Sequence, residues 1–437
     1  NWRYEKGDHI EEHKKKDVFF DSIIKELKIN YKLMGTHFID IKFFQSIKVF
    51  IEKIKNWDIV YNPINIYWDK HIYSSNKIVI KEFKDRWNYI KKDPVLEELF
   101  DNKNRNHIML ELEFYFLVVL PHVVKYKDLA VQMIKKEGPN LILLVNEYSW
   151  RERSLVIAAQ LLNIPVMAVQ HGVIHEFHRG YMYRKKEITL GCPLPDITAV
   201  YGSYYYNLLT GISSYPKDSV IVTGQPRYDH LFAVEQKYLR NQVISKYKIN
   251  PNSKIILWTT QCHGLSMKEN NVNFETVFDC IDNIKEEITL IIKQHPGETN
   301  RYTKMIHRIL KKYKINVIIT AKDADTYELI YACDVLMTKS STTVLEAILL
   351  DKPVIVLNLS GEQDVINFVQ EGVAKGVYNR TSLEPTIVNL LNNDDLKTYR
   401  QKFISQYLFK NDGMATSRVI QAINSIIDRG DVIQTAK

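Results

Sequence analysis

Short apolar segments alternate with amphipathic helical segments from about residue 140 to residue 357, and this alternation constrains the fold more than any other feature. Leu141–Val145 and Ile164–Gln170 are predominantly apolar, and the helical pattern Ser149–Leu162 lies between them. The same alternation predicts further strands at 197–201, 220–223, 254–260, 288–293, 316–320, 335–337 and 353–357. Strands that are apolar on both faces and are separated by helices belong to parallel sheets covered on both sides. The sequence therefore predicts an α/β protein with two doubly wound, Rossmann-like domains.

The chain is long enough for more than one domain, since 437 residues exceed what one ordinary core organises. We place an N-terminal α/β domain at 1–230, a C-terminal α/β domain at 231–405 and terminal helices at 406–437. The region 1–135 is poorly assigned, and its pattern predicts helices at 18–27, 43–54 and 108–136, a strand at 57–61 and a kink near Pro121. Its longest apolar run, Phe114–Leu120, falls short of the ~18 residues that span a bilayer.

Several classes of protein are disfavoured by what the sequence lacks. No GxGxxG or GxxxxGK(S/T) motif occurs, which argues against a dinucleotide enzyme and a P-loop NTPase. The net charge of +8 favours anionic membranes or polyanionic acceptors, or it reflects a Lys-rich composition alone, and no basic–aromatic pattern of a nucleic-acid-binding protein is present. Asp323 and Asp325 precede a helical pattern, so we expect them to cap a helix rather than bind a metal. Neither a disulfide framework nor a zinc site is expected from the four scattered cysteines, Cys192, Cys262, Cys280 and Cys333.

Polar residues follow the predicted strands at their carboxyl ends, where open parallel sheets collect ligands. The first such loop is Gln170-His171-Gly172, whose imidazole is a candidate general base near neutral pH. Alternatively, His171 merely hydrogen-bonds neighbouring carbonyl groups. Glu147 ends the preceding strand and is a second candidate base if it faces the ligand.

Two further loops carry positive charge. In Thr223–Asp229, Arg227 is placed to reach a phosphate, although a plain turn at a domain junction explains the segment equally well. In the other loop, Pro296 ends a strand and fixes the backbone beside His295, while Lys293 supplies charge on the same strand face. These residues are predicted to neutralise a pyrophosphate leaving group without a metal, or else to form a structural strand cap.

The fourth loop places hydroxyl groups at the start of a helix. Ser340, Ser341 and Thr342 stand where free backbone N–H groups favour a phosphate. On the helical wheel, Glu346 lies off the apolar face formed by Val344 and its neighbours, so we expect it to lie outside the core. It is then either solvated or hydrogen-bonded to the ribose of a nucleotide.

These four loops, in this order, resemble those of GT-B glycosyltransferases, and in particular of the branch that builds microbial surface polymers. The Lys293-x-His295-Pro296 segment resembles a motif of capsule polysaccharide transferases and of CDP-glycerol glycerophosphotransferases. Ser340-Ser341 with Glu346 resembles the segment that follows it in the same proteins. The Gln170-His171-Gly172 loop resembles their His-Gly loop, whose histidine is the catalytic base in the glycerophosphotransferases.

The resemblance covers about residues 140–420 and implies a GT-B-like fold. By analogy, the first half binds the acceptor, the second half binds the nucleotide donor across an interdomain cleft, and the C-terminal helices cross back to the first domain. The sequence departs from the glycerophosphotransferases at Val173–His178, where a Lys is usual, and at Glu346, where Asp is usual. Both departures favour a sugar donor over CDP-glycerol.

The sequence therefore predicts a metal-independent, inverting glycosyltransferase that moves a sugar from a nucleotide donor to a surface-glycan or lipid-linked acceptor. It needs no cofactor beyond that co-substrate, whose UDP or CMP type stays open. We expect a cytoplasmic protein at the inner face of the cell membrane that binds no nucleic acid. The alternatives are a CDP-glycerol-type glycerophosphotransferase, a UDP-GlcNAc 2-epimerase-like enzyme and a non-catalytic nucleotide-binding module. The Gly-Thr-Arg-Pro-Glu run typical of the epimerases is absent.

Overall fold

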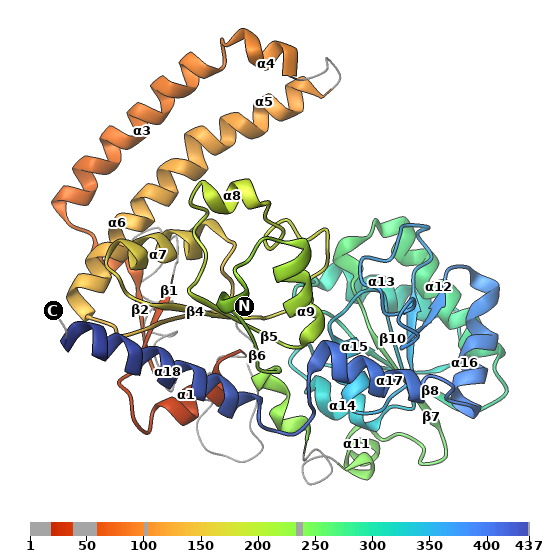
Figure 1. Ribbon diagram of the computed structural model, residues 1–437. Helices are drawn as coiled ribbons and strands as arrows, with labels where there is room; N and C mark the ends of the chain where they lie inside the picture. The colour runs from red at the N-terminus through yellow and green to blue at the C-terminus, as the bar shows by residue number, and fades with distance from the viewer. Residues whose placement is uncertain (1–18, 38–58, 100–103, 233–238, 436–437) are drawn as a thin grey trace.

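The computed structural model describes residues 19–37, 59–99, 104–232 and 239–435, and within them three parallel sheets form (Figure 1). A small sheet pairs β1 (Met34–His37) with β2 (Val60–Pro63). The strand expected at 57–61 corresponds to β2, whereas β1 was not predicted. The helix expected at 43–54 lies outside the described residues.

The first large sheet has the strand order β3-β4-β5-β6, and all its strands were predicted from their apolar runs. Its strands are β3 (Ile142–Leu144), β4 (Val166–Val169), β5 (Ile197–Val200) and β6 (Val220–Val222). The helices that accompany them are α7 (Trp150–Leu161), α8 (Lys185–Thr189) and α9 (Ser203–Asn207).

The second large sheet has the order β12-β11-β10-β7-β8-β9. Its strands are β7 (Lys254–Thr259), β8 (Ile288–Lys293), β9 (Asn316–Ile319), β10 (Val335–Thr338), β11 (Val354–Leu357) and β12 (Lys375–Val377). The edge strand β12 was missed because it is short, carries Gly376 at its centre and lacks an apolar run. The helices of this half are α11 (Arg240–Tyr247), α12 (Met267–Asn283), α13 (Asn300–Leu310), α14 (Thr326–Ala332), α15 (Thr343–Leu349) and α16 (Leu383–Asn392).

The arrangement confirms the predicted α/β class with two doubly wound halves. The first large sheet ends at Val222 and the second begins at Lys254, so the chain passes between them within 223–253.

Asp325 caps α14 as expected, because its carboxylate accepts from the backbone N–H groups of Tyr327 at 2.8 Å and Glu328 at 3.2 Å. The domain boundaries at 230 and 405 stay predictions.

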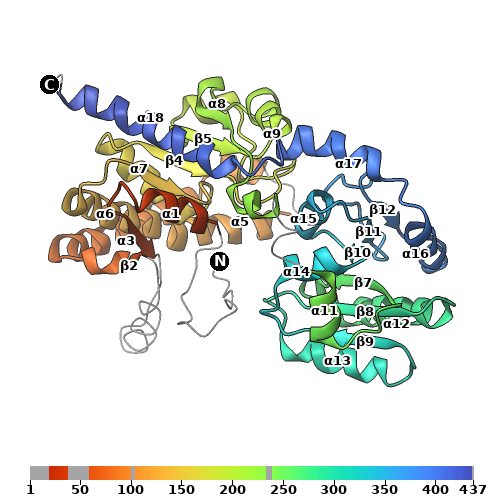
Figure 2. The same cartoon turned by 90° about the horizontal axis from the view of Figure 1, so that it is seen from below.

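The C-terminal segment returns from the second half to the first, as predicted (Figures 1 and 2). It comprises α17 (Lys397–Phe403), a π-helical turn (Ile404–Leu408) and α18 (Ala415–Thr435). Tyr407 stacks on Tyr204 of α9, with ring centroids 4.2 Å apart. The α18 start is held by Asp229, whose carboxylate accepts from the N–H groups of Ala415 at 2.9 Å and Thr416 at 2.7 Å. Asp229 thereby satisfies two N–H groups that a helix start leaves open.

A helical arm projects from the first half (Figure 1). It contains α3 (Lys70–Ile90), α4 (Pro94–Leu99), α5 (Arg105–Phe114) and a π-helical turn (Tyr115–Val119) that continues into α6 (Leu120–Glu137). Another helix, α1 (Asp21–Leu27), lies beside α18. The helix is not broken at Pro121, and the nearest irregularity is the π-helical turn Tyr115–Val119.

The continuous helix Arg105–Glu137 has 33 residues and is long and apolar enough, by length and composition, to cross a membrane. The sequence analysis did not identify this helix as long enough to cross a membrane, because Glu111 and Glu113 interrupt its apolar residues.

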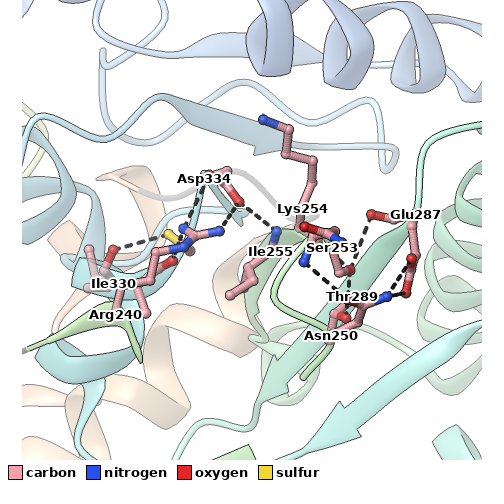
Figure 3. A network of polar contacts seen from close by, with 12 residues as sticks. Arg240, Asn250, Ser253, Lys254, Ile255, Glu287, Thr289, Ile330 and Asp334 are labelled. Carbon is pink, nitrogen blue, oxygen red and sulfur yellow. Dashed lines mark hydrogen bonds and ion pairs between the residues drawn. The ribbon is translucent and has the colours of Figure 1, made fainter. Parts of the chain in front are cut away.

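The amino ends of the second sheet's strands are joined by a polar network (Figure 3). Asp334, just before β10, accepts from the N–H of Ile255 at 2.7 Å and from the guanidinium of Arg240 at 2.8 Å. Beside it, the hydroxyls of Ser253 and Thr289 lie 2.8 Å apart. Through Arg240, this network attaches α11 to the amino edge of the sheet. Ligands of parallel sheets bind at the opposite, carboxyl edge, so the network lies away from the expected binding site.

Candidate functional site

The carboxyl edges of the two large sheets meet at an ion pair. Arg227, in the turn after β6, donates to Glu346 of α15 with 2.5 Å between Nη2 and Oε1. Their side chains are 13% and 5% exposed, so the pair is largely removed from water. The loops that follow β6 and β10 therefore lie against each other, although 119 residues separate the two partners.

The prediction that Glu346 lies outside the core is wrong, because this residue is buried. The helical wheel is correct for α15 alone, but the face that carries Glu346 is covered by Arg227 from the other half. Arg227 is itself enclosed by aromatic rings, with its guanidinium carbon 5.8 Å from the Phe19 ring centroid and 5.3 Å from that of Tyr228. The Arg227 guanidinium is thus paired with the Glu346 carboxylate. A donor phosphate that bound Arg227 would have to share the guanidinium with that carboxylate or replace it.

The His171 loop is fixed to the first sheet by Gln170. The Gln170 amide donates to the carbonyl of Gly172 at 2.7 Å and accepts from the backbone N–H of Tyr201 at 2.9 Å. This side chain joins the ends of β4 and β5 and sets the direction in which the chain leaves β4. His171 therefore follows a rigid residue, as a positioned base requires.

His171 lies among aromatic rings rather than among charged groups. Its Nε2 atom is 3.5 Å from the Tyr148 hydroxyl, and its ring is edge-on to Phe19 at 5.9 Å between centroids. Burial lowers the pKa of His171, and the neighbouring His178 lowers it further, although the backbone at Val145 opposes the shift. The imidazole is therefore neutral at physiological pH, which is the state that accepts a proton.

Two further histidines of the same loop lie near His171, one of them against Tyr148. His178 contacts the Tyr148 ring at 5.0 Å between centroids and the His175 ring at 5.7 Å. Burial lowers the pKa of both His175 and His178. Gly180 closes the cluster, since a Cβ at this position would meet the Tyr148 ring at 2.4 Å. The residues of this loop thus give His171 aromatic and imidazole neighbours.

The structure contradicts the expectation that Glu147 acts as a second base facing a ligand. Its side chain is 1% exposed and lies under the loop rather than at the surface. Its carboxyl group accepts from the hydroxyls of Tyr181 at 3.1 Å, Tyr215 at 3.3 Å and Thr198 at 3.4 Å. Burial raises the pKa of Glu147 to about 7, against the opposing effect of these hydrogen bonds. Glu147 therefore holds the loop from below as a positioning residue.

The loop after β8 presents His295 in a defined tautomer. The backbone N–H of Gly297 donates to Nδ1 of His295 at 3.0 Å, so a neutral ring carries its proton on Nε2. Lys293 is buried and donates to the carbonyl of Lys322 at 2.7 Å. Pro296 is exposed, and β8 ends at Lys293, three residues before it. A neutral His295 thus carries its donor on Nε2, and the Lys293 ammonium donates to the backbone.

The hydroxyl-rich loop after β10 makes its own internal contacts. Gln261 accepts from the backbone N–H of Ser340 at 2.6 Å, and Ser341 accepts from the N–H of Thr343 at 3.2 Å. Thr342 is the residue directly before α15. The Ser340 hydroxyl also donates to Gln261 at 3.4 Å. A phosphate bound at this loop would therefore meet hydroxyls that already take part in the loop's own hydrogen bonds.

Two residues that organise this site escaped the sequence analysis. Gln261 follows β7, which lies between β8 and β10, and it reaches the Ser340 loop. Glu298 is buried and accepts from the Thr260 hydroxyl at 3.0 Å and the Cys262 N–H at 2.6 Å. Both sit just after strand ends, and that position alone could have drawn attention to them.

The structure brings the predicted residues together in two sets. His171 belongs to the first sheet, and its loop contacts Glu147 through Tyr181. His295 and Ser340–Thr342 follow β8 and β10, on either side of β7. Only the Arg227–Glu346 pair joins the halves among the predicted residues whose contacts are given above. Among the described residues, no group of three or more His, Cys, Asp or Glu side chains is placed to hold a metal ion.

Comparison with known proteins identifies relatives of this arrangement. Residues 170–425, more than half of the chain, match the family described as CDP-glycerol:poly(glycerophosphate) glycerophosphotransferase. A teichoic acid poly(ribitol-phosphate) polymerase of Bacillus spizizenii is 23% identical over 225 residues, which cover 47% of this chain and 33% of that protein. The match therefore spans about a third of the length of this curated relative.

Solved structures with the same fold extend over almost the whole chain. The UDP-GlcNAc 2-epimerase of Neisseria meningitidis, bound to UDP-GlcNAc, has a TM-score of 0.57 at 15% identity and covers 93% of this chain and 96% of its own. A glycosyltransferase of Rickettsia africae has a TM-score of 0.52 at 15% identity, with 93% of both chains covered. At these identities the likeness establishes the fold alone, which is the GT-B-like arrangement that the sequence predicted.

Proposed function

The chain belongs to the CDP-glycerol:poly(glycerophosphate) glycerophosphotransferase family, and we propose that it transfers a polyol phosphate from a nucleotide-linked donor to a surface polymer. The observation that carries this proposal is the family match over residues 170–425, which contains His171, His295 and the Ser340–Glu346 loop. The relative from Bacillus spizizenii is a poly(ribitol-phosphate) polymerase, which supports a polyol-phosphate donor.

The proposed reaction uses the neutral His171 as its base. A terminal hydroxyl of the acceptor attacks the phosphorus that carries the polyol, and His171 accepts the hydroxyl proton. A new phosphodiester O–P bond forms, the pyrophosphate P–O bond breaks, and the nucleoside monophosphate leaves. His295, through Nε2–H, and the hydroxyls of Ser340, Ser341 and Thr342 stabilise the charge on the departing phosphate.

One of the two arguments for a sugar donor is weakened by the structure. Glu346 stands where the glycerophosphotransferases usually have Asp, but its carboxylate is paired with Arg227. The extra methylene therefore serves a contact between the two halves, and it carries no information about the donor. The other argument, the Val173–His178 departure, still applies, so nucleotide-sugar transfer stays the second candidate.

The leaving group distinguishes these candidates. Purified protein is incubated with CDP-glycerol, CDP-ribitol and UDP-, GDP- and CMP-sugars, together with a lipid-linked or short polyol-phosphate acceptor. Polyol-phosphate transfer releases CMP and extends the acceptor, whereas transfer from a UDP-sugar releases UDP. An epimerase converts its substrate without an acceptor. Nucleotide binding without turnover of any donor would instead identify a non-catalytic module and refute the proposal.

Three histidine variants assign the roles. We expect His171→Ala to reduce kcat by about 100- to 10,000-fold with little change in donor binding, because it removes the base. His295→Ala should weaken donor binding and turnover together. His307→Ala is the matched control, since His307 lies exposed on α13. Equal activity of the His171 and His307 variants would remove His171 from the mechanism.

A cytoplasmic enzyme at the inner face of the membrane fits this reaction, because activated donors are cytoplasmic and surface polymers grow on lipid carriers. We propose that location for this protein.

A further inference from the structure

Tyr148 lies in the turn between β3 and α7, at the carboxyl edge of the first large sheet. The side-chain oxygen of Asn146 accepts from the backbone N–H groups of Tyr148 at 3.0 Å and Ser149 at 3.2 Å, which fixes the course of the turn. Since β3 pairs with β4, the turn stands beside the loop that follows β4 and carries His171. Tyr148 precedes the matched residues 170–425, so the family match gives it no role.

The aromatic ring of Tyr148 is held by close packing. It meets the rings of His178 and Tyr181 edge-on, at 5.0 Å and 5.2 Å between centroids. Gly180 lies so close to it that a Cβ there would be 2.4 Å from the ring. Tyr181 is itself fixed by its hydrogen bond to Glu147 at 3.1 Å. The direction of the Tyr148 hydroxyl is therefore set by the packing of its ring.

The Tyr148 hydroxyl differs from the other tyrosine hydroxyls near this loop. Those of Tyr181 and Tyr215 donate to Glu147 at 3.1 Å and 3.3 Å. In the part of the chain that the structure describes, the Tyr148 hydroxyl reaches one partner, Nε2 of His171, and the 3.5 Å between the two atoms is long for a hydrogen bond. The Tyr148 hydroxyl therefore has hydrogen-bonding capacity that the protein itself leaves unused.

Both atoms of this pair are in the state that binding a hydroxyl group requires. Burial raises the pKa of Tyr148, so its hydroxyl keeps the proton at physiological pH. Burial lowers the pKa of His171, so its ring is neutral. Nδ1 of His171 is enclosed by the protein, which leaves Nε2 as the ring nitrogen that can reach a substrate. The pair thus combines a hydroxyl donor with an imidazole acceptor.

We propose that Tyr148 is a further catalytic residue, which binds the attacking hydroxyl of the acceptor together with His171. An oxygen about 2.8 Å from both the Tyr148 hydroxyl and Nε2 of His171 closes a triangle on their 3.5 Å separation. The acceptor O–H donates to Nε2, and the acceptor oxygen accepts from the Tyr148 O–H. The second lone pair of that oxygen is then directed at the donor, which is the orientation that attack requires.

The step needs no further reactant. In polyol-phosphate transfer the acceptor oxygen forms the new O–P bond, the pyrophosphate P–O bond breaks towards the nucleoside monophosphate, and the acceptor proton moves to Nε2 of His171. Tyr148 keeps its own proton and fixes the position of the nucleophile. The proposal rests on the proposed function because it requires an acceptor hydroxyl, but transfer of a sugar to that hydroxyl would use the same pair.

Tyr148→Phe tests this role, because it removes the hydroxyl and keeps the ring. With the donor that the leaving-group experiment identifies, we expect kcat to fall roughly 10- to 100-fold, which corresponds to the loss of a hydrogen bond to a group that gains charge. The thermal-unfolding midpoint and the calorimetric affinity for the released nucleotide should not change. Tyr399→Phe is the matched control, because the Tyr399 ring also packs against a glycine, Gly372, and is 53% exposed on α17. This control should keep the full kcat.

The double variant His171→Ala/Tyr148→Phe tests whether the two residues act as a unit. Once the base is absent, the Tyr148 hydroxyl no longer completes a pair, so the double variant should be about as slow as His171→Ala alone. Losses that multiply in the double variant would separate Tyr148 from the base. Either that result or an unchanged kcat in Tyr148→Phe would overturn the proposal.

Nitrogen-15 NMR of the histidine rings tests the geometry without any substrate. We expect a neutral His171 with its proton on Nδ1 and its free electron pair on Nε2, and we expect Tyr148→Phe to shift the Nε2 resonance. His171→Ala identifies the signals, and those of the exposed His307 should stay in place. A His171 ring that carries its proton on Nε2 would overturn the proposal. Because this measurement needs no turnover, it remains decisive even if the proposed reaction fails with every donor.

Discussion

Glu147→Gln tests how a buried carboxyl group beneath the candidate base affects stability. Glu147 is 1% exposed, and burial raises its pKa from 4.5 to about 7. The three hydroxyls around it, those of Tyr181, Thr198 and Tyr215, can also donate to the glutamine carbonyl oxygen. The variant therefore keeps the shape and most of the hydrogen bonds, and it removes the titration.

The sign follows from the direction of the pKa change. Below pH 4.5 the carboxyl is protonated in both the folded and the unfolded chain, so it imposes no penalty. Between pH 4.5 and 7 the unfolded chain ionises while the folded chain retains the proton, and the free energy of unfolding decreases. The shift of about 2.5 pH units corresponds to a loss of about 3 kcal/mol, complete above pH 7.

The assay is urea unfolding of the unaltered protein and of Glu147→Gln at a series of pH values from 4.5 to 8.5. The difference in unfolding free energy between the two proteins should change by about 3 kcal/mol in favour of the glutamine variant as the pH rises. Glu384→Gln, at an exposed position, is the control and should leave the pH dependence unchanged. Parallel pH profiles for the unaltered protein and Glu147→Gln would refute the assignment of a buried, protonated Glu147.

Two further predictions concern the contacts between the halves. Arg227→Met alone or Glu346→Gln alone should destabilise the protein by about 3–5 kcal/mol, because each removes one partner of a buried ion pair. The double variant should recover part of this loss in a double-mutant cycle measured by urea unfolding, and simple additivity would contradict the coupling. Gly202→Ala should destabilise the protein by about 1–3 kcal/mol, because the added Cβ would meet the Gln406 carbonyl oxygen at 2.3 Å. A thermal-unfolding midpoint equal to that of Gly211→Ala, where a Cβ has open space, would show that this approach is not tight.

The sequence by itself determined the strands from β3 to β11 and their order along the chain. The apolar runs located β3 to β11, and the position of Asp325 before a helical pattern identified its capping role. It also located the polar loops at the carboxyl ends of the strands. These features depend on residues close together in the chain, so periodicity and turn chemistry report on them directly.

The tertiary structure alone decided the partners of the polar residues. Glu346 is buried by Arg227, 119 residues away, and Glu147 by hydroxyls of Tyr181, Thr198 and Tyr215. A helical wheel describes one helix in isolation, and it cannot tell which face another part of the chain will cover. Likewise, the exposure of the Arg105–Val119 part of the arm followed from where that helix stands, since its composition alone would also suit a buried core helix.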